Sequence, residues 1–274
     1  MLRAAGGVVT VLTLLIVLTQ DFQIYAELSH RLLQGPAAVH PPVPTAMDGF
    51  VRTVDGEMIS YRRWGPTGSK RSRLRAAILS QGNAGTMDGY HTIPLWLTEQ
   101  GIAAYVYDYR GYGRSTGWPS ERGIYRDIEA IWNEVQRREQ ITPAELLLFG
   151  HSLGGGPAAY LAETRGAAVL ITAATYTSVP DRVARHPYFS LLAPFVWTNF
   201  PNRERIARLQ NTCLIVLHAG HDDGMPYAVS RQLYAAYRGA SRAFFAEHPD
   251  ATHGDIIRYV PALAEPLLAQ CPGL

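Results

Sequence analysis

One stretch decides the fold: LLLFGHSLGGGPAAYLA, residues 146–162. It opens with a run of apolar residues, as in a strand buried on both faces, and its last residues favour a helix. Ser152 lies between these two parts in the pattern G-x-S-x-G, residues 150–154. Between a strand and a helix, this pattern is typical of a nucleophile elbow, whose sharp turn exposes the serine hydroxyl. The glycines on either side of Ser152 let the backbone turn without a clash of side chains.

The rest of the chain alternates between apolar runs and helical patterns. Two runs around Asp55 and Gly56 predict a hairpin over residues 49–64. Helices are expected over residues 90–100 and 121–138, and from about residue 255 onward. Further strands are predicted at residues 76–82, 102–109, 145–150, 167–174, 212–220 and 242–248. Apolar strands separated by helices indicate an α/β fold with a mostly parallel sheet covered on both faces.

Ser152 would then lie where open parallel sheets bind ligands, outside the carboxyl ends of the strands. A serine hydroxyl is a poor nucleophile at neutral pH, and it needs a base and an acid that orients the base. In this context the acid and then the histidine follow the serine along the chain, each after a later strand. Asp222 and Asp223 both follow the run at 212–220, so both are candidates for the acid.

Two histidines near the C-terminus are candidates for the base. His253 stands in the loop directly before the last predicted helix. His248 ends the preceding strand and is followed by Pro249. We therefore expect His253 to be the base and keep His248 as the alternative.

From about Phe50 to the C-terminus, the chain resembles the α/β-hydrolase superfamily, whose triad Ser152, Asp222 and His253 would form. The family spacing D-x-x-hydrophobic-P runs from Asp222 to Pro226 and favours Asp222 over Asp223. The closer resemblance is to a group of membrane-anchored serine hydrolases that includes protein depalmitoylases. QGNAG, residues 81–85, is similar to that group's HGNAG. YDYRGYGRSTGWPSERGIYRDIEA, residues 107–130, resembles its stretch YRGYG-x-S-x-G-x-P-S-E.

The resemblance also implies an oxyanion hole, formed by the backbone N–H groups of Leu153 and Asn83. Two such donors would stabilise the negative charge that develops on a carbonyl oxygen under attack. This sequence departs from the family pattern at two places: Gln81 replaces the usual histidine, and Ala219 replaces the usual glycine before Asp222. We expect a reshaped oxyanion hole, because a glutamine can still hold the loop by hydrogen bonds.

These residues predict a hydrolase that cleaves carboxylic esters or thioesters through an acyl-enzyme on Ser152, with small-molecule or lipid-like acyl substrates. A peptidase or amidase with the same triad is the alternative, and a non-catalytic binding protein on this fold is a further one. No cofactor is expected. His218, His221 and Asp222 could suggest a metal site, but the triad accounts for Asp222 and the strand end for His218, so no metal is expected either.

The segment from about residue 178 to 208 is expected to form a small cap that sets substrate choice. It contains HPYFSLLAPFVWTNFP, residues 186–201. These aromatic and aliphatic side chains would line an acyl pocket, contact a membrane, or form a pair of short helices packed on the core. The loop around Arg110 and Arg114 is expected to be structural, with anion binding as the alternative.

The N-terminus carries a localisation signal. Residues 4–20 contain no charge and would span roughly 25 Å as a helix, close to the thickness of a membrane core. We therefore predict a membrane anchor or signal segment over residues 1–21, an amphipathic helix and a Pro-rich linker over 22–46, and the catalytic domain over 47–274. Arg3 before the apolar run and Asp21 after it place the catalytic domain on the non-cytoplasmic side. A secreted or periplasmic protein, after signal cleavage, is the alternative.

Composition agrees with one large α/β domain: 274 residues, 47% of them hydrophobic. The formal net charge of +2 implies no nucleic-acid partner. Cys213 and Cys271 are too few and too far apart for a disulfide scaffold or a metal site. We expect Cys213 to be a buried free thiol, with a single disulfide as the alternative in an exported protein. The sequence does not indicate the oligomeric state.

Overall fold

The computed structural model describes Tyr25 and residues 46–68, 72–186 and 190–273. Its centre is an eight-stranded sheet with the strand order β1-β2-β4-β3-β5-β6-β7-β8. From β4 to β8 all neighbouring strands are parallel, while β1 and β2 form the predicted hairpin and β2 pairs antiparallel with β4. The strands are β1 (Ala46–Arg52), β2 (Met58–Trp64), β3 (Ala76–Ser80), β4 (Ala103–Tyr107), β5 (Leu146–His151), β6 (Val169–Ala173), β7 (Cys213–His221) and β8 (Ala243–Thr252). The predicted α/β fold with a mostly parallel sheet is confirmed.

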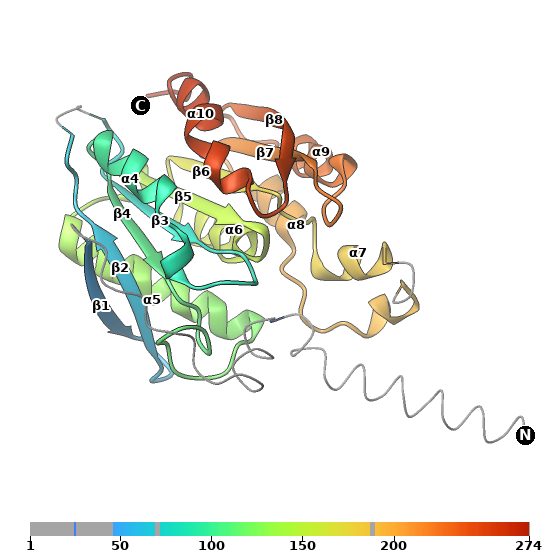
Figure 1. Ribbon diagram of the computed structural model, residues 1–274, viewed down its shortest axis with the longest axis horizontal. Helices are drawn as coiled ribbons and strands as arrows, with labels where there is room; N and C mark the ends of the chain where they lie inside the picture. Colours follow the sequence, from blue (N-terminus) through green and yellow to red (C-terminus); the bar gives the residue numbers. More distant parts are fainter. Residues whose placement is uncertain (1–24, 26–45, 69–71, 187–189, 274) are drawn as a thin grey trace, which may run out of the picture.

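Helices cover both faces of this sheet (Figure 1). One face carries α4 (Thr92–Glu99) and α10 (Ile256–Leu268). The other carries α5 (Glu121–Glu139), α6 (Gly155–Arg165), α8 (Asn202–Arg208) and α9 (Tyr227–Ala236). Alternate residues of β5 show the reason for the continuous apolar runs: Leu146 and Leu148 enter one core, and Leu147 and Phe149 enter the other.

The predicted element boundaries are close to those observed. Helix α5 begins where the side chain of Ser120 accepts a hydrogen bond from the backbone N–H of Gly123 at 3.1 Å, and it ends one residue later than expected. Strand β8 is longer than predicted and continues to Thr252. Its pairing with β7 extends past an irregularity between Ala219 and His221, which the polar sequence of this segment did not reveal.

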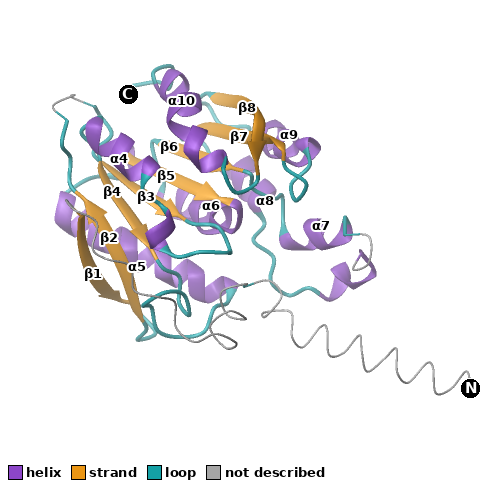
Figure 2. Ribbon diagram, in the orientation of Figure 1, coloured by secondary structure: helices purple, strands orange, loops and turns teal. Residues whose placement is uncertain are grey.

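The cap segment contains α7 (Val179–Ala184) and a 3-10 helix, η4 (Ser190–Phe195). Figure 2 shows α7 set apart from the sheet. Its residues line the same cavity as Ser152, which directly follows the end of β5. This cap therefore stands over one end of the sheet rather than over a face.

The prediction of a free thiol is wrong, because Cys213 and Cys271 form a disulfide. Cys213 begins β7, and Cys271 lies in the turn that follows α10. The 58 residues between them hid the pairing, because only the return of α10 across the sheet brings the C-terminus beside the start of β7. Both sulfur-bearing residues are buried.

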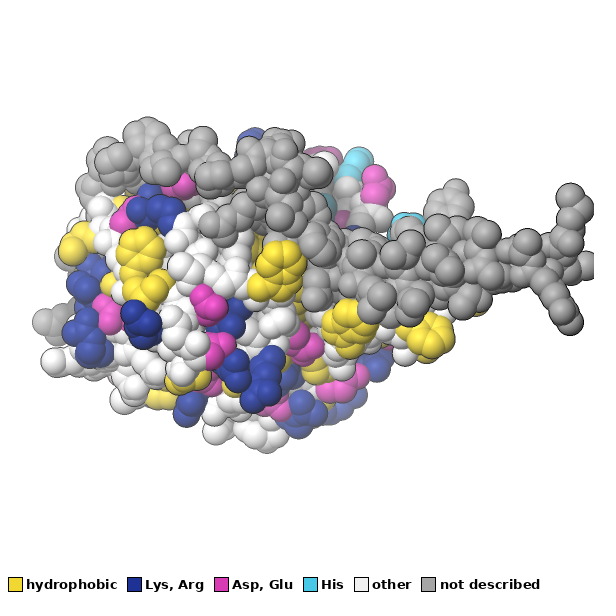
Figure 3. All heavy atoms as spheres, turned by 90° about the horizontal axis from the view of Figure 1, so that it is seen from below, with side chains coloured by type: hydrophobic (Ala, Val, Ile, Leu, Met, Phe, Trp, Pro, Cys, Tyr) yellow, Lys and Arg dark blue, Asp and Glu magenta, His cyan; other side chains and the backbone are white. Residues whose placement is uncertain are grey.

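Within the described residues, no helix is long and apolar enough to cross a membrane. The predicted anchor over residues 1–21 lies outside them, as does all of the 22–46 segment except Tyr25 and Ala46. The division of the chain into three segments stays a prediction. On the face seen in Figure 3, the described basic and acidic side chains are interspersed, as the small net charge suggests.

Candidate active site

Ser152 sits at a strained turn between β5 and α6. Its φ angle is +52°, in the left-handed region that residues with a side chain rarely adopt. A short 3-10 helix, η3 (Ser152–Gly154), connects the strand to α6. Such strain costs roughly 1–3 kcal/mol and persists only where the surrounding structure enforces it. The predicted elbow is therefore present.

Close approach explains the two glycines of the pattern. A Cβ at Gly154 would overlap the carbonyl oxygen of Ser80, at the end of β3, and one at Gly150 would lie 2.5 Å from the carbonyl oxygen of Gly154. Neither glycine has a positive φ, so the unusual conformation falls on Ser152 itself. The elbow packs tightly against the end of β3, and the loop that follows β3 begins at Gln81.

A chain of hydrogen bonds links Ser152, His253 and Asp222, the three residues predicted to form the triad. The distance from His253 Nε2 to Ser152 Oγ is 3.0 Å, and that from His253 Nδ1 to Asp222 Oδ2 is 2.8 Å. Asp222 Oδ1 accepts the backbone N–H groups of Gly224 at 2.9 Å and Met225 at 2.7 Å. The Asp222 side chain is fully buried, so these bonds fix it in one orientation.

The alternative residues lie outside this chain. Asp223 is exposed and lines the cavity beside Ser152, but it makes no hydrogen bond to His253 among the described contacts. His248 lies in β8, and its ring stacks on that of Tyr259 at a centroid distance of 3.7 Å. The geometry therefore brings together Ser152, Asp222 and His253.

Sequence reasoning missed a second hydrogen-bond chain, which passes through the buried residues Tyr90 and His151. His151 Nε2 lies 2.9 Å from the carbonyl oxygen of His253, which can only accept, so Nε2 carries the proton. His151 Nδ1 therefore accepts the hydroxyl of Tyr90 at 2.8 Å. The Tyr90 oxygen in turn accepts the backbone N–H of Gly82 at 2.8 Å.

This chain, Gly82–Tyr90–His151–His253, joins the loop after β3 to the loop that carries the candidate base. Burial lowers the pKa of His151 to about 4, so its imidazole is neutral near pH 7 and both ring nitrogens keep the roles just described. His151 lies inside the G-x-S-x-G pattern of residues 150–154, but nothing in the sequence connects it to Tyr90, 61 positions away.

Tyrosines and a buried carboxylate hold the loop after β3. The Gln81 side chain is fully buried, and its Nε2 lies 3.4 Å from Asp108 Oδ1. The Gln81 carbonyl accepts the Tyr109 hydroxyl at 2.6 Å, and the side-chain oxygen of Asn83 accepts the Tyr112 hydroxyl at 2.8 Å. Burial raises the pKa of Asp108. The residues that follow β4 thus anchor the loop in which the oxyanion hole is predicted.

The loop that contains Arg110 and Arg114 is structural, as expected. Arg110 is buried and pairs with Asp55 and Asp127, both at 2.9 Å. Arg114 pairs with Asp48 at 2.6 Å.

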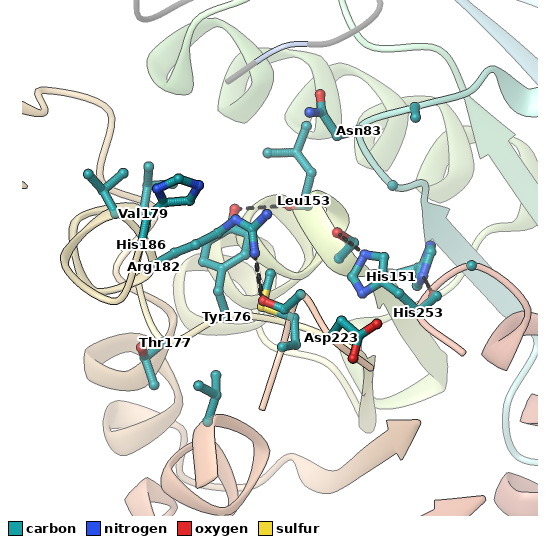
Figure 4. Close-up of a pocket in the computed structure, with 18 of the residues that line it drawn as sticks. Asn83, His151, Leu153, Tyr176, Thr177, Val179, Arg182, His186, Asp223 and His253 are labelled. Carbon is teal, nitrogen blue, oxygen red and sulfur yellow. Dashed lines mark hydrogen bonds between the residues drawn. The ribbon is translucent and has the colours of Figure 1, made fainter. Parts of the chain in front are cut away.

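A cavity of about 850 Å³ opens above Ser152. Asn83 and Leu153, the predicted oxyanion-hole residues, both line it (Figure 4). The Leu153 N–H belongs to the first turn of η3, where backbone N–H groups have no partner within the helix. The cap contributes five apolar side chains to the lining: Val179, Val183, Leu192, Phe195 and Val196. The cap therefore lines the cavity, while Val179 also packs on the core.

Among the described residues, no group of three or more His, Cys, Asp and Glu side chains is arranged to hold a metal. His218 Nδ1 pairs with Ser230 Oγ at 3.0 Å.

A parallel sheet with a serine elbow after β5, facing an aspartate after β7 and a histidine after β8, defines an α/β hydrolase of the serine-hydrolase class. Residues 72–212 match the family described as "Serine aminopeptidase, S33", and the chain belongs to this family.

Individual proteins similar to this chain are consistent with its membership of this family and with its fold. Uncharacterized protein Rv2307c of Mycobacterium tuberculosis is 30% identical over 230 residues, which cover 82% of this chain and 80% of that protein. Uncharacterized protein YfhR of Escherichia coli is 28% identical over 204 residues, 70% of each chain. The crystal structure of an alpha-beta hydrolase from Vibrio vulnificus has a TM-score of 0.71 at 18% identity, over 91% of each chain. Est1E from Butyrivibrio proteoclasticus, solved with ferulic acid bound, has a TM-score of 0.66 at 15% identity, over 81% of this chain and 98% of that one. The two structures share the fold with this chain.

Proposed function

We propose that the protein hydrolyses carboxylic esters or thioesters through an acyl-enzyme on Ser152. The observation that carries this proposal is the hydrogen-bond chain from Ser152 through His253 to Asp222, at a strained elbow that faces a cavity. Such a chain turns a weak nucleophile into an active one, because the histidine accepts the serine proton as the new bond forms.

In the proposed cycle, Ser152 Oγ attacks the substrate carbonyl carbon, and its proton moves to His253 Nε2. Asp222 accepts the Nδ1–H of the resulting imidazolium and stabilises its charge. The tetrahedral intermediate collapses, the bond to the leaving group breaks, and the leaving group takes the proton from Nε2. Water then repeats the sequence on the acyl-enzyme and restores Ser152. No cofactor takes part in these steps.

We assign the oxyanion hole to the backbone N–H groups of Leu153 and Asn83. Each donor of this kind contributes about 3–4 kcal/mol to the stabilisation of a transition state. The hydrogen bonds that hold Gln81 and Asn83 support this assignment, because they fix the loop before substrate arrives.

Lipid-like or acylated substrates fit the apolar lining that the cap gives to the cavity. The cap also carries exposed apolar side chains at Leu191, Phe195 and Trp197, which suit contact with a membrane or an acyl chain. The peptidase or amidase alternative is favoured by the description of the family to which the chain belongs. A non-catalytic binding protein is the remaining alternative.

We further propose that residues 1–21 anchor the protein in a membrane, with the catalytic domain on the non-cytoplasmic side. The Cys213–Cys271 disulfide supports this location, because disulfides persist in oxidising compartments. Secretion or periplasmic release after signal cleavage would agree with the disulfide equally well.

Hydrolysis of p-nitrophenyl esters from short to long acyl chains, with and without detergent micelles, tests the proposal. Each ester is compared with the thioester and the anilide of the same acyl group. Ser152→Ala should abolish hydrolysis, while Ser72→Ala, at the opposite end of the sheet, should not. Activity that survives in Ser152→Ala would refute the proposal, and a preference for anilides would select the amidase alternative.

A further inference from the structure

Two arginines of the cap line the cavity above Ser152. Arg182 and Arg185 both belong to α7 or its C-terminal end, and both contribute to the cavity wall. Because the rest of the cap lining is largely apolar, these are conspicuous groups for a substrate to meet. One acidic side chain, Asp223, also lines the cavity. The neighbouring Asp222 accepts hydrogen bonds from His253 and two backbone N–H groups instead.

The partners of both arginines are neutral. Arg182 Nη1 donates to the carbonyl oxygen of Gly224 at 2.7 Å, and Arg185 Nη2 donates to the side-chain oxygen of Gln232 at 3.3 Å. Within the described part of the chain, neither guanidinium forms an ion pair with a carboxylate, whereas Arg62, Arg110 and Arg205 all do. Arg182 Nη1 also lies 3.9 Å from the Met225 sulfur, a weak acceptor. A guanidinium offers five N–H donors, so these contacts leave most of its hydrogen-bonding capacity unused.

Arg182 also lies beside the loop that carries Asp222. A Cβ placed on Gly224 would be 3.4 Å from Asp222 Oδ1, 3.7 Å from Arg182 Nη1 and 4.0 Å from His253 Nδ1. In Figure 4 the Arg182 side chain extends from α7, and a dashed line marks its hydrogen bond to the Gly224 carbonyl oxygen. The Tyr176 hydroxyl in turn donates to the carbonyl oxygen of Leu153 at 3.4 Å. Arg182 and Tyr176 therefore line the same cavity as Ser152 and Leu153, and Arg182 is tied to the loop that carries Asp222.

We propose that Arg182, assisted by Arg185, binds an anionic group of the substrate, so that the preferred esters or thioesters carry a carboxylate or a similar anion. A guanidinium binds a carboxylate through two parallel hydrogen bonds, and low-dielectric walls strengthen the attraction. The bond that breaks is still the acyl bond attacked by Ser152, and the anion is held without being changed. This inference rests on the proposed function and narrows its substrate class.

Matched substrate pairs test it. The first pair sets p-nitrophenyl monoesters of dicarboxylic acids against uncharged p-nitrophenyl esters of the same length, which places the anion on the acyl side. The second pair sets esters of 4-hydroxybenzoate against those of 4-hydroxybenzamide, which places it on the leaving group. We expect the wild type to prefer the anionic member of at least one pair, and high salt to weaken that preference.

Arg182→Gln should lower kcat/KM for the preferred anionic substrate about tenfold more than for its neutral partner, the usual effect of losing a hydrogen bond to a charged group. Arg182→Lys should restore part of the preference, because it keeps the charge. Arg203→Gln is the matched control, because it removes an exposed cation of α8 that pairs with Glu204 outside the cavity. Equal kcat/KM for both members of each pair, unchanged in Arg182→Gln, would overturn the inference and leave ester hydrolysis standing.

Binding separates this inference from a failure of the proposed function. Calorimetry on the Ser152→Ala protein compares a long-chain dicarboxylate monoamide with the corresponding diamide. Tighter binding of the anionic compound, reduced about tenfold by a second substitution, Arg182→Gln, supports the inference even if no ester is hydrolysed. Equal binding of the two compounds counts against it.

Discussion

Loss of the Cys213–Cys271 disulfide is expected to destabilise the protein strongly. The bond joins residues 58 positions apart, and the loop-closure entropy of the unfolded chain for this separation corresponds to about 4 kcal/mol at 25 °C. For a domain of this size, each kcal/mol shifts Tm by roughly 2–4 °C, so the expected fall is about 8–16 °C.

Three variants test this reasoning: Cys213→Ala, Cys271→Ala and the double variant. All three lose the same bond, so thermal unfolding should give nearly the same Tm for each, because the second substitution removes no further cross-link. Treatment of the wild type with a reductant should produce a fall of similar size. Two reactive thiols in the denatured, non-reduced wild type, together with additive effects of the single substitutions, would refute the bond.

The same change should leave catalysis nearly intact at 25 °C. Cys213 begins β7, whereas Asp222 follows the last residue of that strand, so the disulfide and the candidate site lie at opposite ends of the sheet. A large loss of kcat at 25 °C in the cysteine variants would show instead that the disulfide-linked C-terminal helix positions the site.

Two further predictions concern the buried chain beside the site. Tyr90→Phe removes a hydroxyl that bonds to Gly82 and His151, so the free energy of unfolding, measured with denaturant, should fall by about 2–6 kcal/mol. In ester hydrolysis, kcat should fall by a larger factor than KM rises. An unchanged unfolding free energy together with an unchanged kcat would contradict the positioning role. His151 has a pKa of about 4 in the folded protein against about 6.5 in the unfolded chain, so the unfolded state binds more protons between these values. Stability should therefore fall by about 3 kcal/mol as pH drops from 6.5 to 4, and His151→Gln should remove this dependence in unfolding measured across that range.

Much of the fold could be predicted because parallel strands buried on both faces read as continuous apolar runs. Strands β3 to β7 all have this character. Strand β8 does not, because it lies at the edge of the sheet and its last four residues, Pro249–Thr252, form no apolar run. Its end depends on pairing with β7, which local sequence does not encode.

The candidate triad was accessible from the sequence because chain order and the strand ends limit where an acid and a base can lie. Its supporting contacts were not. The bond from His151 to the His253 carbonyl joins residues 102 positions apart, and the disulfide joins residues 58 apart. Each pairing depends on how the fold brings distant segments together. The residue types alone are equally compatible with ordinary structural roles in the core or on the surface.

The chain through Ser152 and Asp222 and the chain through Tyr90 and His151 both include His253, and each fixes a different part of that residue. Its imidazole connects Ser152 to Asp222, while its backbone carbonyl is held by His151. A base on a loop before a helix would otherwise sample several positions, and a displacement of about 1 Å can cost a hundredfold in rate. Because the second chain ends at Gly82, directly before Asn83, one set of buried bonds fixes both the base and the proposed oxyanion donor. Arg182 differs from these groups. It lies on the short cap helix α7, and only its Nη1 contacts the Gly224 carbonyl oxygen and the Met225 sulfur, so its other donors remain for the proposed anion while the reacting groups stay fixed.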